Sequence, residues 1–195
     1  MNYDDKCQLL IIGDSTVGKT CILSKYTSKT FNENYLGTVG LDFFTKDEII
    51  ESKTIRIKIW DTAGQERYKA LTKCFFQKAE GIIIVFDVCN QKTFNDLRFW
   101  IQSINSYFNE DVDSIPVIVI GNKIDLSKRV VNKETAETFA KEKNYAYYET
   151  SAKTGEGVDK AIRELAQKVL NSGGKKNGKD YLRLSKIEKK NKCCC

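Results

Sequence analysis

Histidine is absent from the 195 residues of this sequence. Without imidazole the chain has neither a histidine general base nor an imidazole metal ligand, so any bound metal must be held by oxygen or sulfur. The sequence also lacks an apolar run of the roughly 20 residues that a membrane-spanning helix needs. The first residues, Met1 to Asp5, are acidic and do not form the basic segment of a signal peptide. We therefore expect a globular protein of the cytosol.

The cysteines lack the CxxC spacing that is typical of zinc sites. Four of the seven are scattered along the chain, which favours neither a zinc site nor a disulfide framework. The other three, Cys193, Cys194 and Cys195, stand together as the last residues of the sequence. These three need an explanation of their own.

The net charge of +6 lies entirely in the C-terminal segment. From Asn171 onward there are eight Lys and Arg residues against two Asp and Glu, whereas the charges of residues 1–170 balance. Asn171 to Gly174 break the last helical pattern, and the lysine-rich stretch that follows is predicted to be a solvated, disordered tail. We predict one domain over residues 1–170, large enough for a sizeable core, and a tail over residues 171–195.

Short apolar runs alternate with helical patterns along the first 170 residues. The expected strands are Cys7 to Ile12, Leu41 to Ile50, Thr54 to Trp60, Ile82 to Phe86, Val117 to Ile120 and Ala146 to Glu149. One expected helix begins at Lys19. The others cover Thr93 to Phe108, Lys133 to Lys143 and Val158 to Leu170. The second and third strands read as a hairpin, so the order predicts an α/β sheet that is mostly parallel with one antiparallel edge strand. In such sheets ligands bind outside the carboxyl ends of the strands.

A phosphate-binding loop is predicted from Gly13 to Thr20, which fits the pattern G-x-x-x-x-G-K-[ST] between a strand and a helix. Inward-facing backbone N–H groups and a helix N-terminus form an anion cradle there. Lys19 would reach the β- and γ-phosphates, and the hydroxyl of Thr20 would bind Mg²⁺, which prefers oxygen ligands. The alternative is a chance glycine turn, which the flanking strand and helix disfavour.

A second motif follows at the end of the hairpin. Asp61 ends the second hairpin strand and suits an acidic partner for Mg²⁺, either directly or through water. Gly64 can bring its N–H close to a terminal phosphate, and Gln65 can orient an attacking water. Taken alone this segment would be a surface turn, but beside a phosphate loop it favours nucleotide hydrolysis.

The segment Asn122-Lys123-Ile124-Asp125 follows the buried strand that begins at Val117. The carboxylate of Asp125 can accept hydrogen bonds from N1–H and the 2-amino group of guanine, whereas adenine offers neither donor. Sites built in this way discriminate on the order of 10⁴-fold. Ser151-Ala152-Lys153, after the last strand, can supply a backbone N–H to guanine O6. Together these segments predict a preference for guanine.

With these motifs in this order, the chain resembles the Ras-like small GTPases and, within them, the Rab branch. The resemblance covers residues 7–170 and the terminus. Rab-like segments are Thr38 to Phe43, Lys58 to Asp61, Glu66 to Tyr68, Phe75 to Ala79 and Val85 to Val88. The resemblance implies a P-loop NTPase fold, with a six-stranded, mostly parallel sheet that has one antiparallel strand and is flanked by about five helices.

The resemblance also implies roles for residues outside the first motifs. Thr38 would bind Mg²⁺ only when a γ-phosphate is present, Phe31 would pack edge-on against guanine, and Tyr35 would close over the phosphates. The nucleotide-binding set is then Gly13, Ser15, Thr16, Val17, Gly18, Lys19, Thr20, Cys21, Phe31, Tyr35, Thr38, Gly64, Asn122, Lys123, Asp125, Ser151, Ala152 and Lys153. The metal ligands are Thr20, Thr38 and Asp61, and the catalytic residues are Gln65 and Lys19.

An effector-binding surface is implied in the same way. It comprises Val39, Gly40, Leu41, Asp42, Phe43, Trp60 and Phe75, among which Phe43, Trp60 and Phe75 form an aromatic triad. The alternative role for these aromatic side chains is core packing, and for Trp60 both roles are compatible.

Three segments depart from the usual Rab pattern. Thr16 stands where glycine or alanine is usual, and a β-branched residue there restricts the loop backbone. Gly37 precedes Thr38 and would loosen that segment when no γ-phosphate holds it. Phe75-Phe76 replaces a common tyrosine pair, which removes two hydroxyl groups.

The terminal cysteines do not form a CaaX box, because the fourth residue from the end is Lys192. By resemblance, geranylgeranyl groups are expected on Cys194 and Cys195, with Cys193 as a third candidate. Stable anchoring of a protein to a membrane takes two signals, and basic residues near an anionic membrane contribute to the binding. A metal-binding or oxidisable cysteine cluster is the alternative. Nucleic-acid binding is disfavoured because Tyr181 is the single aromatic residue of the tail.

The sequence therefore predicts a monomeric GTPase domain that binds GTP or GDP with Mg²⁺ and acts as a membrane switch in vesicle trafficking. The resemblance implies an exchange factor, a GTPase-activating protein, an escort or dissociation-inhibitor protein and effectors as partners, and no nucleic acid. The expected location is the cytosol and the cytoplasmic face of vesicles, Golgi, endosomes or plasma membrane. A GTP-binding scaffold with negligible hydrolysis stays open because of Thr16, and an ATP-using kinase or ATPase is disfavoured by Asp125.

Overall fold

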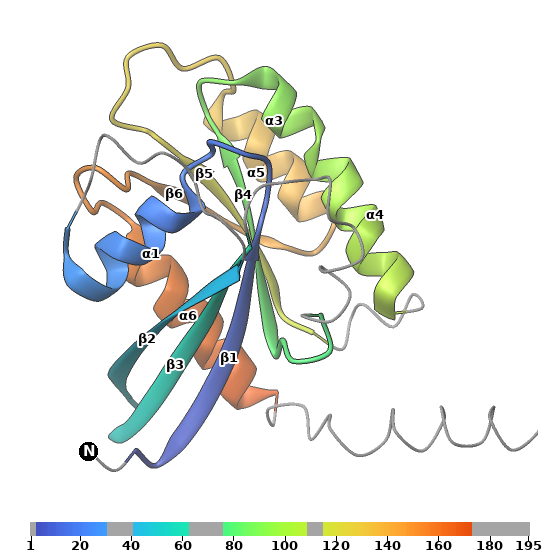
Figure 1. The fold of residues 1–195 in the computed structure, drawn as a ribbon. Coiled ribbons are helices and arrows are strands. Elements are labelled where there is room, and N and C mark those ends of the chain that lie inside the picture. The colour runs from blue at the N-terminus through green and yellow to red at the C-terminus, as the bar shows by residue number, and fades with distance from the viewer. Residues whose placement is uncertain (1–2, 31–40, 63–75, 109–114, 173–195) are drawn as a thin grey trace, which may run out of the picture.

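A computed structural model of the chain describes residues 3–30, 41–62, 76–108 and 115–172, and Figure 1 shows its arrangement. Six strands form one sheet in the order β2-β3-β1-β4-β5-β6. Their bounds are β1 Asp5–Ile12, β2 Leu41–Ile50, β3 Lys53–Thr62, β4 Gly81–Asp87, β5 Val117–Asn122 and β6 Ala146–Thr150. The helices are α1 Lys19–Ser28, α3 Gln91–Asn95, α4 Leu97–Phe108, α5 Lys133–Glu142 and α6 Val158–Asn171.

Strand β2 is antiparallel to β3, and every other neighbouring pair of strands is parallel. The hairpin turns at Glu51 and Ser52, whose φ angles are 49° and 65°. Two successive residues at positive φ are what a type I′ turn requires, and its twist matches that of the strands. The predicted sheet with one antiparallel strand is therefore confirmed, and the turn is one residue shorter than the sequence suggested because Lys53 already belongs to β3.

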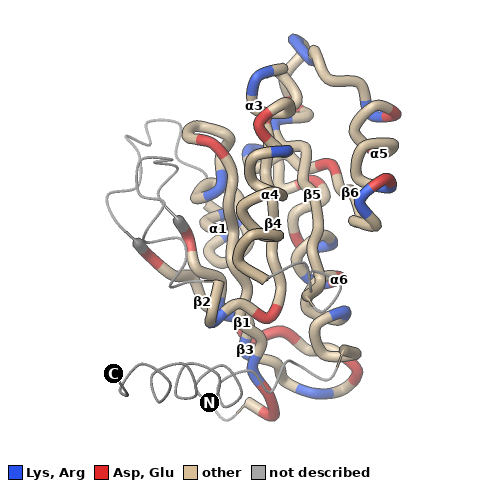
Figure 2. The backbone as a smooth tube through the Cα atoms, turned by 90° about the vertical axis from the view of Figure 1, so that its right-hand side faces the viewer, with Lys and Arg blue, Asp and Glu red and all other residues tan. Residues whose placement is uncertain are grey.

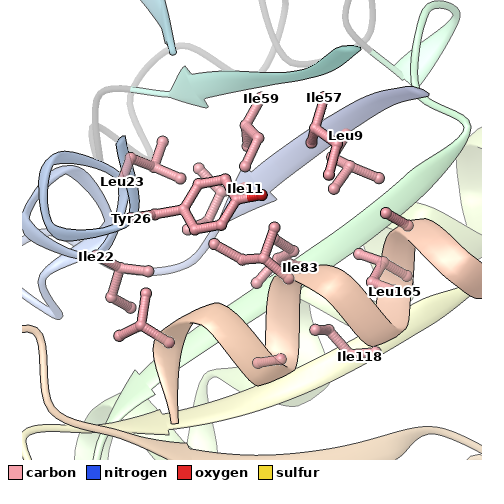
Figure 3. Packing of buried hydrophobic residues seen from close by; sticks show 14 of the residues in the cluster. Leu9, Ile11, Ile22, Leu23, Tyr26, Ile57, Ile59, Ile83, Ile118 and Leu165 are labelled. Atoms are coloured by element: carbon pink, nitrogen blue, oxygen red, sulfur yellow. The ribbon is translucent and has the colours of Figure 1, made fainter. Parts of the chain in front are cut away.

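The central strands are apolar on both faces, which is why they read as continuous hydrophobic runs. Leu9 and Ile11 of β1 join the core on one face, together with residues of α1 and α6. Figure 3 shows this cluster around Tyr26 and Leu165. The alternate residues of β1 join a second core, which packs against α3, α4 and α5. The helices thus cover both faces, and the carboxyl ends of five parallel strands meet at one edge.

The helix predicted from Thr93 to Phe108 is divided at Asp96 into α3 and α4. The backbone N–H of Asp96 bonds to Lys92 O, and its own carbonyl accepts from Phe99 N, so the chain turns without leaving the sheet surface. Figure 2 shows charged residues of the described chain on the helices, in loops and along the hairpin strands β2 and β3, whereas the central strand β5 carries none. Within the described ranges, no helix has the length and apolar character needed to cross a bilayer.

Candidate functional site

The loop between β1 and α1 depends on two glycines. Gly13 and Gly18 have φ angles of 139° and 95°, which side chains rarely allow. A Cβ at Gly13 would lie 2.3 Å from the carbonyl oxygen of Val85, and one at Gly18 would lie 2.5 Å from Nδ2 of Asn122. The glycines of the predicted phosphate loop are therefore required both by backbone conformation and by the close approach of β4 and β5.

Thr16 in the same loop also adopts a left-handed conformation, with a φ of 64°. This conformation is unusual for any residue except glycine and is an outlier for a β-branched one. The side chain is exposed, so its own packing does not compensate for this backbone conformation. The departure noticed in the sequence thus falls at a position where the backbone itself favours a residue without a branched Cβ.

Lys19 begins α1 and is buried, with 6% of its surface exposed. Its ammonium group donates hydrogen bonds to the carbonyl oxygens of Gly13 at 2.8 Å and Asp14 at 2.7 Å. A buried cation needs such partners because burial otherwise disfavours its charge. The loop backbone therefore holds this charge in place beneath the N-terminus of α1.

Thr20 and Asp61 meet next to Lys19, although 41 positions separate them in the sequence. The hydroxyl of Thr20 donates to Oδ2 of Asp61 at 2.5 Å. Asp61 lies at the end of β3 and is fully buried. In the described ranges no group of three or more Cys, Asp or Glu side chains could hold a metal ion by itself. A hydroxyl and a carboxylate side by side are oxygen donors of the kind that Mg²⁺ prefers.

Asn122 connects three separate loops at the carboxyl end of β5. Its Nδ2 donates to the carbonyl oxygen of Val17 in the phosphate loop at 2.8 Å. Its Oδ1 accepts from the hydroxyl of Thr150 at 3.0 Å and from the backbone N–H of Ala152 at 3.2 Å. The side chain is 1% exposed, so it fixes these loops relative to one another rather than contacting solvent.

Two further contacts extend this end of the site. The hydroxyl of Ser151 donates to Oδ1 of Asp125 at 2.6 Å, which fixes one carboxylate oxygen. The ammonium of Lys123 forms an ion pair with Asp87 at 2.7 Å, and Lys123 has a φ of 71°. Both contacts bring the ends of β4, β5 and β6 together at the same edge of the sheet.

A patch of aromatic and basic side chains lies on the hairpin. The rings of Phe43 and Trp60 are 5.5 Å apart, and Phe43 is 51% exposed. The ammonium of Lys58 lies 3.8 Å from the Phe43 ring centre and 4.0 Å from that of Trp60. Asp42 is exposed beside them. An exposed phenylalanine next to a cation is a feature that core packing does not explain.

Comparison with known proteins agrees with this geometry. The model of the Ras family matches residues 8–171. "Ras-related protein Rab-13" of Rattus norvegicus is 39% identical over 199 residues, which cover 98% of this chain and 97% of the relative. The proteins of the same name from Mesocricetus auratus and Bos taurus are each 41% identical, over 90% and 89% of this chain and 86% and 85% of their own.

The chain belongs to the Ras family of small GTPases, in its Rab branch. The P-loop fold, the GTPase activity and the role in vesicle trafficking that the sequence predicted are those of this family. Membership of this family also implies that the chain binds guanine nucleotides and has effectors and regulators.

Several residues predicted for the site of this GTPase lie outside the described ranges. They are Phe31, Tyr35, Thr38, Val39, Gly40, Gly64, Gln65, Phe75 and Cys193 to Cys195. Leu41 begins β2. The described ones lie along the carboxyl edge of the sheet, where Ser15 and Lys153 are exposed, Val17 is in the core and Cys21 is half-buried. Burial raises the pKa of the Cys21 thiol, so it is not a ready nucleophile.

Sequence reasoning missed three residues of this GTPase that the structure brings to the site. Asp87 pairs with Lys123, Thr150 bonds to Asn122, and Trp100 bonds to Asp14. Asp87 and Thr150 carry a signal, since each is a polar residue at the carboxyl end of a buried strand. Trp100 carries none, because it falls at a regular apolar position of an amphipathic helix.

Proposed function

We propose that this Rab-like GTPase holds the base of GTP or GDP against Asp125 and Ser151 and its phosphates in the loop from Gly13 to Thr20. The observation that carries this proposal is the hydrogen bond from Asn122 to Val17, because it ties the base-side loops to the phosphate loop. The bond supports a single site with two ends. The chain is a GTPase of vesicle trafficking, and the residue roles below are the proposal.

At the base end, Asp125 would accept the N1–H and 2-amino hydrogens of guanine. The bond from Ser151 leaves the other oxygen and the remaining lone pairs of the carboxylate for this task. The segment from Ser151 to Lys153, which the bond from Ala152 N–H to Asn122 holds at this end of the site, would supply a backbone N–H to guanine O6. Lys123 would lie along the base, held by its ion pair with Asp87.

At the phosphate end, the residues present fit a magnesium ion. Thr20 and Asp61 supply two oxygen donors within hydrogen-bonding distance, and Thr38 would add a third when a γ-phosphate is bound. Mg²⁺ characteristically binds one or two protein oxygens and completes its shell with phosphates and water. When bound there, it would neutralise charge on the β- and γ-phosphates. A Mg²⁺ site that also includes nucleotide phosphates therefore needs only a few protein ligands.

Hydrolysis would proceed by in-line attack of water on the γ-phosphorus, with rupture of its bond to the β–γ bridging oxygen. Gln65 would orient the water, while Lys19 and the loop N–H groups stabilise the charge that develops on the phosphate oxygens. Loss of the γ-phosphate would remove the contacts of Thr38 and Gly64 and end the active state. Intrinsic turnover is expected on the order of 10⁻⁴ s⁻¹, with acceleration by an activating protein that supplies an arginine.

A second candidate function is GTP binding with negligible hydrolysis. It is favoured by one observation, the left-handed backbone of Thr16, because a strained phosphate loop can misplace N–H groups that stabilise the transition state. Single-turnover hydrolysis of radiolabelled GTP by the full chain separates the two candidates. The proposal expects slow release of phosphate that a GTPase-activating protein accelerates and that Gln65→Leu abolishes. Bound GTP that stays intact in the chain alone, with an activating protein and in Gln65→Leu would identify a scaffold instead.

We also propose that the domain of residues 1–170 is carried to membranes by its tail. Geranylgeranyl groups on Cys194 and Cys195, with Cys193 as a third candidate, and eight basic residues would provide the two signals that stable anchoring takes. Replacing all three cysteines by serine should make the full-length protein wholly cytosolic in cell fractionation. Replacing Cys89, a half-buried cysteine of the domain, is the control. A triple variant that stays on endomembranes would refute lipid anchoring.

A further inference from the structure

Three residues spaced four apart face the phosphate loop: Lys92 lies in α3, Asp96 between the two helices and Trp100 in α4. Lys92, Asp96 and Trp100 fall on one side of the helical segment because i and i+4 positions share a face. Lys92 and Asp96 form an ion pair with each other. Asp14, the second residue of the loop, lies against this stripe, which places α4 next to the phosphate end of the site.

The contacts converge on the carboxylate of Asp14. The indole N–H of Trp100 donates to its Oδ1 at 2.8 Å, and the ammonium of Lys92 lies 3.8 Å from its Oδ2. The side chain of Asp14 is 17% exposed, and Trp100 is 7% exposed. Burial and the neighbouring carboxylate of Asp96 raise the pKa of Asp14, whereas the bond from Trp100 and the charge of Lys92 favour its charged form. A carboxylate this enclosed gains more from a hydrogen bond than an exposed one does.

Asp14 is joined to the proposed machinery through its backbone. Its carbonyl oxygen accepts from the ammonium of Lys19 at 2.7 Å. The side chain of Asp14 therefore contacts α4, and its main chain contacts Lys19, which we assign to the phosphates. We propose that Trp100 is a positioning residue that anchors Asp14 and thereby fixes the loop carbonyls that orient Lys19.

The physical basis is preorganisation. A loop already held in its binding conformation loses less freedom when the phosphates bind, so its affinity is higher. The loop includes Thr16 at a φ of 64°, a conformation that persists only when surrounding contacts hold it. The bond from Trp100 is one such contact from outside the loop. Its loss should therefore weaken nucleotide binding without changing which base is preferred.

The test measures release of a fluorescent N-methylanthraniloyl GDP from the full chain in the presence of Mg²⁺. Trp100→Phe keeps an aromatic ring and removes the donor, and about tenfold faster release is expected. Asp14→Ala should give a similar rate, and the double variant should be no faster than either single one, because both remove the same bond. Asp14→Asn keeps an oxygen acceptor and should restore most of the slow release. Arg98→Ala, an exposed position of α4, is the control and should be unaffected.

This inference rests on the proposed function, and its failure can be told apart from that of the function. A wild-type chain that does not bind the GDP analogue at all refutes the nucleotide site itself. Tight wild-type binding with release unchanged in Trp100→Phe overturns the positioning role alone. Release that is faster in Trp100→Phe but unchanged in Asp14→Ala would assign Trp100 to packing. Effects that multiply in the double variant would do the same, and either result would overturn the positioning role.

Discussion

The guanine end of the proposed site is held together by side chains, whereas its phosphate end is shaped by the backbone. Asn122, Thr150 and Ser151 are nearly or fully buried and bond to one another's loops. At the phosphate end, Gly13, Thr16 and Gly18 all have positive φ, whereas among the residues named at the guanine end only Lys123 does. Buried side-chain networks specify a unique arrangement, whereas loops with unusual backbone angles depend on neighbours to hold them.

This difference suggests a division of labour. Substitutions at the guanine end should change which base is bound and how stable the domain is, because its side chains serve both purposes. Substitutions at the phosphate end should change affinity for nucleotides of any base. Asn122 is where the two ends meet, since its amide bonds to the phosphate loop.

The largest effect is expected at the phosphate end, from Lys19→Ala. The change removes a buried ammonium with two hydrogen bonds to the loop and its contacts to the phosphates. Affinity for GDP should fall about a thousandfold, which corresponds to about 4 kcal/mol for charge-assisted bonds. Competition against a fluorescent GDP analogue measures it. Lys29→Ala, which removes an exposed ion pair with Asp159, is the control; a comparable loss in both variants would show that the effect is not local.

The next effect tests the junction between the two ends. Asn122→Ala leaves the buried carbonyl of Val17 and the hydroxyl of Thr150 without this partner. The free energy of unfolding should fall by about 3 kcal/mol, because buried polar groups lose their hydrogen bonds. Urea denaturation of the domain measures it, with Asn95→Ala on the exposed side of α3 as the control. Full stability in Asn122→Ala would mean that the two ends are not tied through this residue.

The smallest effect concerns Thr16. Asparagine tolerates the left-handed conformation better than a β-branched residue, so Thr16→Asn should raise stability by about 1 kcal/mol. The thermal unfolding midpoint of the full chain should rise by a few degrees. Thr135→Asn replaces an exposed threonine within α5 and should not stabilise. A midpoint that falls in Thr16→Asn would argue that the loop carries no strain at this residue.

The sequence predicted the sheet, and the predicted site residues that the structure describes gather at one edge of it, because strand periodicity and the motifs after each strand are local signals. The division of the α3–α4 segment at Asp96 was not predicted, since its apolar pattern continues through that residue. The bond from Asn122 to Val17 and the bond from Trp100 to Asp14 were also not predictable. They join residues 105 and 86 positions apart, so they depend on how the elements pack. The sequence showed that threonine is unusual at position 16, but it did not show that this residue has a positive φ.

The most direct test compares GDP with ADP as competitors for the site of the full chain and of Asp125→Ala. Wild-type protein should prefer GDP on the order of 10⁴-fold, because adenine would leave the carboxylate of Asp125 desolvated and unpaired. In Asp125→Ala the preference should fall by at least a hundredfold, while ADP binding stays as weak as before. A preference for GDP that is unchanged in Asp125→Ala would contradict the assignment of the guanine end.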